Sequence, residues 1–90
     1  MSWLSKLIDR YWKAALKAAV LKQLDQFSVA FQDGKLDNIE VAKGALTAYI
    51  QSQHRVPGEL RRWACAVIND TDANDLLAWL SRVRASVKCW

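Results

Sequence analysis

The residue types that most often carry out chemistry are few in this chain and lie far apart. There is one histidine, His54, and there are two cysteines, Cys65 and Cys89. Nucleophilic catalysis needs a hydroxyl or thiol beside a base that a third group orients, and the spacing predicts no such partner for His54. One histidine and two cysteines at these spacings also match no pattern of zinc ligands. We therefore expect a protein that is not an enzyme and has no catalytic residue, metal, cofactor or small-molecule substrate.

The cysteines are expected to stay reduced. Cys65 and Cys89 fall on two consecutive helical segments, and folding these back to back leaves them ~20 Å apart at 1.5 Å per residue. A disulfide needs Cα atoms within ~7 Å, so an intramolecular bridge is not expected. The first residues also lack the continuous apolar stretch and cleavage site of a signal peptide. Free thiols and the lack of a leader both favour a cytoplasmic protein.

Length and composition favour one small helical domain. The chain has 90 residues, of which 52% are hydrophobic and 24% charged, and this balance is unlike that of disordered or fibrous sequences. No segment alternates apolar and polar residues with the period of a strand, whereas apolar residues recur at helical spacing. We predict an all-α, four-helix domain over residues 1–90. Its first part, 1–20, is an amphipathic basic segment, and 21–90 form the helical core.

Capping and turn residues place the four helices. A helix starting near Ser2 should end at Asp33-Gly34, because glycine favours the backbone conformation that terminates helices. Pro57 is a favoured first helical residue. Asp37 and Glu40 have the spacing of a capping box. The predicted helices are 2–31, 37–53, 57–68 and, after the segment 69–72, a last one that ends near residue 87.

Apolar stripes on the last three helices predict their buried faces. Each stripe recurs at intervals of three and four residues, the pattern of a helix that buries one side. The expected core residues are Ile39, Ala42, Leu46, Tyr49 and Ile50; Leu60, Trp63, Ala64 and Val67, with Ile68 at the edge; and Leu76, Trp79, Leu80, Val83 and Val87, with Trp90 as a further candidate.

The first helix has two apolar stripes on opposite sides. Up to Ala19 the apolar residues lie on one side, and from Val20 onward they lie on the other. A helix that buries a single stripe does not show this change. Either the helix breaks or kinks near residues 20–22 so that both stripes reach one core, or its first half projects and is covered by something else. The residues of the first stripe are Trp3, Leu4, Leu7, Ile8, Tyr11, Ala14, Ala15, Ala18 and Ala19.

A projecting first half favours a function in protein binding. Apolar helices with aromatic anchors dock into grooves of partner proteins or pair with a second copy. We expect Trp3, Leu7, Tyr11 and Trp12 to act as anchors. The cations on the other side of the helix would attract an acidic surface; they are Lys6, Arg10, Lys13 and Lys17.

Two further functions remain open. The cluster of Arg55, Arg61 and Arg62 at the start of the third helix could contact phosphates of a nucleic acid. Alternatively, residues 2–20 combine an apolar face carrying Trp3 with a Lys/Arg face, which is typical of a helix lying on a membrane surface.

A strip of small residues on the second helix adds a packing prediction. It consists of Val41, Gly44, Ala45, Ala48 and Ser52, and it would let another helix approach closely. We expect that helix to belong to the same bundle, the alternative being a helix of a partner protein. In size and helix order the chain is similar to several groups of small bacterial or phage accessory proteins, among them the bacteriocin immunity proteins. This similarity implies a helical bundle and assigns no residue a role.

Overall fold

The chain is an all-helical domain of four helices. The computed structural model describes residues 2–90, with side chains from residue 8 onward. Within these residues the helices are α1 (Ser2–Gln32), α2 (Ile39–Gln51), α3 (Gly58–Asn69) and α4 (Leu76–Lys88), and no strand is present. The predicted fold class is confirmed.

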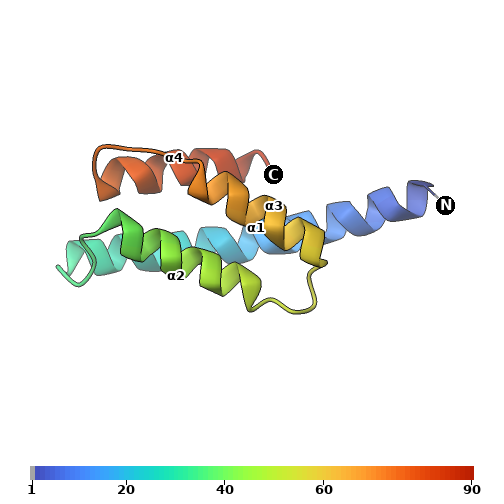
Figure 1. The fold of residues 1–90 in the computed structure, drawn as a ribbon, viewed down its shortest axis with the longest axis horizontal. Helices are drawn as coiled ribbons and strands as arrows, with labels where there is room; N and C mark the ends of the chain where they lie inside the picture. The colour runs from blue at the N-terminus through green and yellow to red at the C-terminus, as the bar shows by residue number, and fades with distance from the viewer. Residues whose placement is uncertain (1) are drawn as a thin grey trace.

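Consecutive helices run in opposite directions, and α1 is the axis of the molecule (Figure 1). It packs against α2 and α4, while α3 packs against α2. The 31 residues of α1 span about 46 Å at 1.5 Å per residue, nearly the full length of a molecule measuring 48 × 21 × 17 Å. The N-terminal part of α1 extends beyond the ends of the other three helices.

The helix termini follow from local hydrogen bonds, some of them at residues other than those predicted. Gly34 ends α1 with φ 74°, and the amides of Gly34 and Lys35 donate to the carbonyls of Phe31 and Ala30, which confirms the predicted stop. The cap of α2 is Asn38 rather than Asp37: its Oδ1 accepts from the amide of Glu40 at 2.8 Å.

The starts of α3 and α4 also differ from the prediction. Pro57 has extended backbone torsions and precedes the first helical residue of α3 instead of being that residue. The last helix begins at Leu76, later than expected. Its cap is Asp75, whose Oδ1 accepts from the amide of Ala78 at 2.8 Å, while the segment before it remains a loop.

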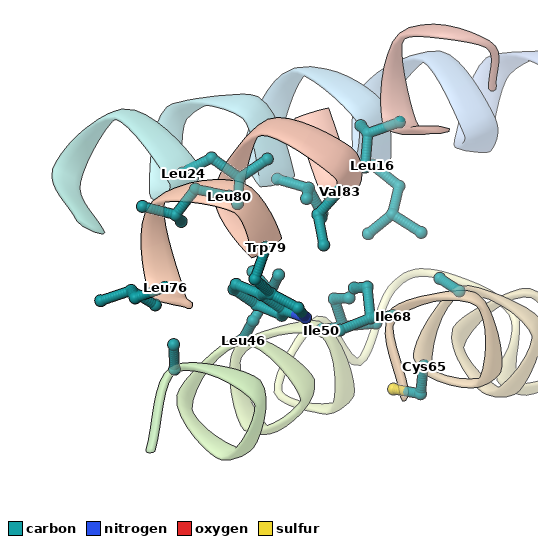
Figure 2. Packing of buried hydrophobic residues seen from close by; sticks show 14 of the residues in the cluster. Leu16, Leu24, Leu46, Ile50, Cys65, Ile68, Leu76, Trp79, Leu80 and Val83 are labelled. Atoms are coloured by element: carbon teal, nitrogen blue, oxygen red, sulfur yellow. The ribbon is translucent and has the colours of Figure 1, made fainter. Parts of the chain in front are cut away.

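Trp79 lies at the centre of the core, with its ring among Leu46, Ile50 and Ile68 (Figure 2). Burying a large apolar side chain contributes about 1.5–3 kcal/mol, so such contacts hold the four helices together. The stripes predicted for the second and fourth helices are confirmed as core. The buried residues include Ala42, Leu46 and Ile50 of α2 and Leu76, Trp79, Leu80, Val83 and Val87 of α4.

The core face of α3 is rotated from the predicted one. Its buried residues are Ala64, Cys65 and Ile68, whereas Trp63 is 39% exposed. The Trp63 ring instead lies 5.0 Å from that of Trp90, at the edge of the bundle. Trp63 as a core residue was therefore wrong: small residues let α3 approach α2 closely, and the large indole is left on the flank.

The strip of small residues on α2 does not pack within the bundle. All five of its residues are exposed, because α1 and α3 contact α2 on its other sides. The expectation of close helix packing over this strip was therefore wrong.

The helix α1 runs unbroken from Ser2 to Gln32 and Ile8, Tyr11 and Ala15 of its first stripe are exposed, so the predicted alternative of a break or kink that brings both stripes to one core was wrong. The inner stripe begins earlier than the sequence indicated, with Trp12 packed against the core and Leu16 fully buried. Val20 and Leu24 continue it. One straight helix thus carries a buried stripe and, on its opposite side, a second stripe that nothing in the described bundle covers.

Candidate functional site

The side of α1 that faces away from the bundle, which we call the outer face, is an open helical surface that runs along the described length of α1. Its residues are separated alternately by three and four positions, so they line one side of the helix. All of them are exposed: Ile8, Tyr11, Ala15, Ala18, Lys22, Asp25, Val29 and Gln32.

The largest apolar side chains of this face lie near the projecting end. Ile8 is 47% exposed and Tyr11 is 66% exposed. The ring of Tyr11 meets that of Trp12 edge-on, with centroids 5.0 Å apart and planes at 75°. Because Trp12 is half-buried and packs against the core, it supports the exposed tyrosine from below. The pair presents an aromatic surface on a rigid helix.

The predicted cations of α1 lie in different surroundings. Arg10 is exposed and Lys17 is half-buried. The Nζ of Lys13 lies 5.1 Å from the centroid of the Trp63 ring, within the range of a cation–π contact. These two residues help to line a hollow of about 230 Å³ between α1 and the start of α3, together with Asp9, Pro57, Glu59 and Leu60.

The three arginines proposed for nucleic-acid contact do not form one surface. Arg61 turns back onto its own loop: Nη1 donates to the carbonyl of Gln51 at 2.9 Å and Nε donates to the carbonyl of Val56 at 3.1 Å. Arg55 and Arg62 are exposed. The guanidinium of Arg61 therefore fixes the connection between α2 and α3.

Charge is separated along the length of the molecule. Residues 2–17 of α1 and the segment 52–62 lie toward the same end (Figure 1), and together they contain seven Lys/Arg and two Asp/Glu. At the opposite end lie 25–43 and 69–76, which contain seven Asp/Glu and two Lys/Arg. We call these regions the basic end and the acidic end. The exposed Tyr11 and Ile8 lie on the basic end.

Both cysteines are free thiols, as the sequence predicted. Cys65 is buried and Cys89 is exposed. Burial raises the pKa of the Cys65 thiol, against the opposing effects of a hydrogen bond from Gln51 and the charge of Arg61. A raised pKa keeps this thiol protonated at neutral pH and makes it a weak nucleophile.

Three of the residues predicted to bind a partner, Trp3, Lys6 and Leu7, have side chains outside the described residues. Tyr11 lies on the outer face, whereas Trp12 lies between that face and the core. Sequence reasoning missed the continuation of the outer face from Lys22 to Gln32. The alternating spacing of three and four residues indicates this continuation. The pattern of apolar stripes does not show it, because Lys22 and Asp25 are charged.

Comparison of the chain with models of protein families, with curated proteins and with solved structures gave no match. Among the residues that the structure describes, no His, Cys, Asp and Glu side chains gather into a group of three or more that could hold a metal ion. Over the same residues, no helix has both the length and the apolar character that crossing a membrane requires.

Proposed function

We propose that this protein acts by binding: the basic end docks on an acidic surface of a partner protein, as a regulator, inhibitor or adaptor. The observation that carries the proposal is the exposure of Tyr11, 66%, on an unbroken helix whose opposite side is core. Large aromatic residues that a rigid scaffold leaves exposed are typical anchors of protein interfaces.

The charges around Tyr11 support an acidic partner. Seven cations against two carboxylates give the basic end a net positive charge, and Arg10 is exposed one residue before Tyr11. Such a field raises the rate of encounter with a negatively charged surface. In this mechanism Tyr11 and Ile8 enter an apolar pocket of the partner, and the cations form the polar rim.

The proposal predicts that Tyr11→Ala abolishes binding and leaves the fold intact. Because Tyr11 is mostly exposed, the free energy of unfolding should fall by less than about 1 kcal/mol. Binding is measured by isothermal titration with a partner isolated from the source cells on the immobilised wild-type chain. The control is Leu77→Ala, which removes an exposed apolar side chain on α4, next to the acidic end.

Three results would contradict the proposal. A loss of several kcal/mol on Tyr11→Ala would make Tyr11 a structural residue. Sedimentation of the chain with vesicles of anionic lipid, lost on Tyr11→Ala, would make the apolar face a membrane contact. Binding to nucleic acid that weakens on Arg55→Ala and Arg62→Ala, with a steep dependence on salt, would place the function on those arginines.

A further inference from the structure

We propose that the C-terminal part of the outer face, from Ala15 to Gln32, pairs with the same segment of a second copy of this chain, with the two helices antiparallel. This inference concerns residues that the proposed docking of the basic end does not use. It rests on the shape of this segment and on its pattern of charge.

The shape is that of a helix which receives a side chain from a facing helix. Lys22, Asp25, Gln26 and Val29 line a shallow hollow of about 350 Å³. Counted from the first, they lie at positions i, i+3, i+4 and i+7, the four positions that surround an inserted side chain in a coiled coil. The hollow therefore fits a facing helix.

The charge pattern identifies that helix as a second copy. Lys22 and Asp25 are the only charged residues of the outer face. In an antiparallel pair with two-fold symmetry, Lys22 faces the partner's Asp25 while Asp25 faces the partner's Lys22, so the same ion pair forms twice. A parallel pair in register would instead place each lysine against the other lysine.

Side-chain sizes agree with the same register. Ala18 then lies opposite the partner's Val29, and Val29 opposite the partner's Ala18, so a small residue meets a larger one on either side of the charged pairs. Val29 is 57% exposed in the single chain and would be covered. The segments that overlap extend over 18 residues, about 27 Å of helix, and they leave Ile8 and Tyr11 outside the contact.

Asp25 keeps room for this contact although it is already paired within the chain. Its Oδ1 forms an ion pair with Nη2 of Arg84 at 2.7 Å, which holds the carboxylate beside α4, and the side chain is still 67% exposed. A carboxylate accepts several hydrogen bonds, so the same group has capacity for the ammonium of the partner's Lys22. The stem of that lysine would pack against Val29 at the side of the hollow.

The test is sedimentation equilibrium of the full chain, under reducing conditions because Cys89 is exposed. The wild-type chain should form dimers as its concentration rises. Lys22→Glu and Asp25→Lys should each weaken the dimer about tenfold or more, because each places like charges opposite each other twice. An equimolar mixture of these two variants should restore the dimer, since the introduced glutamate then faces the introduced lysine and the native residues pair as before.

Two controls keep the result specific. Lys35→Glu makes the same charge change as Lys22→Glu but lies in the loop after α1, so the dimer should persist. Asp25→Lys also removes the ion pair with Arg84, and thermal unfolding shows whether that variant folds. If it does not fold, Ala18→Glu replaces it, because it puts a charge against the partner's Val29 and should also give a monomer.

A wild-type chain that remains monomeric at all concentrations overturns the proposal. So does a dimer that neither charge reversal weakens, or a mixture of the two variants that stays monomeric. Loss of the dimer on Tyr11→Ala, which lies outside the overlap, would equally exclude this register. The two proposals are separable, since Lys22→Glu should leave docking of the acidic partner unchanged.

Discussion

Arg61 has a structural role, although the sequence suggested that it could contact a nucleic acid. Its guanidinium donates to the backbone carbonyls of Gln51 and Val56, at the end of α2 and in the following loop. The Gln51 carbonyl is in the last turn of α2 and has no partner within that helix, whereas Val56 lies in the loop before α3. A single cation thereby satisfies both carbonyls and holds the turn that leads into α3.

We predict that Arg61→Ala lowers the free energy of unfolding by about 1–2 kcal/mol, since two charge-assisted hydrogen bonds on a half-buried side chain are lost. Arg62→Ala is the matched control and should change stability by less than about 0.5 kcal/mol, because Arg62 is exposed. Urea unfolding of both variants measures the difference. Equal stability of the two would show that the Arg61 contacts contribute nothing.

Two aspartates near the start of α4, Asp72 and Asp75, have different roles. Asp75 caps the helix through the amide of Ala78. Asp72 makes a single long ion pair, 3.8 Å from Nζ of Lys43, and its side chain is 93% exposed. The same residue type, three positions apart, thus performs a structural task in one case and lies in solvent in the other.

Asp75→Ala should therefore cost about 1 kcal/mol of stability, the usual effect of removing a helix cap. Asp72→Ala should cost almost nothing, because an exposed ion pair contributes little. Thermal unfolding of the two variants at neutral pH measures this contrast. A larger loss for Asp72→Ala than for Asp75→Ala would contradict the observed helix start.

Periodicity predicted the helices and most of the core, because a buried stripe must recur with the helical turn. It predicted the start of α4 less well, since Asn69, Asp70, Asp72 and Asp75 can all act as caps and only packing selects one. The burial of Trp63 was predicted wrongly because periodicity carries no information on how closely α3 approaches α2.

The sequence predicted only the first half of the outer face. The first half of the outer face stands out because its residues are apolar, including Tyr11 and Ile8. Its second half contains Lys22 and Asp25. From the sequence alone these two are interpreted as ordinary solvent-exposed charges, because the sequence does not show that the helix is unbroken. Only the three-dimensional arrangement shows that both halves share one open side.

The molecule is elongated, so the maximum dimension of a dimer depends on how the two chains pair. The single chain is 48 Å long. Antiparallel pairing over residues 15–32 would shift the two α1 helices against each other and give a maximum dimension of about 65 Å, at 1.5 Å per residue. We predict this value from small-angle X-ray scattering of the wild-type dimer. A dimer no longer than about 50 Å would mean that α1 pairs along its entire length.

The separation of charge between the two ends makes the single chain an electric dipole. In the field of a negatively charged surface it should rotate and arrive with the projecting end of α1 first, which aligns Tyr11 and Ile8 with their target before contact. Two antiparallel copies oppose their dipoles and largely cancel them. Pairing would thus remove the torque that orients the chain while leaving its docking residues uncovered, so self-association alone could slow the capture of a partner.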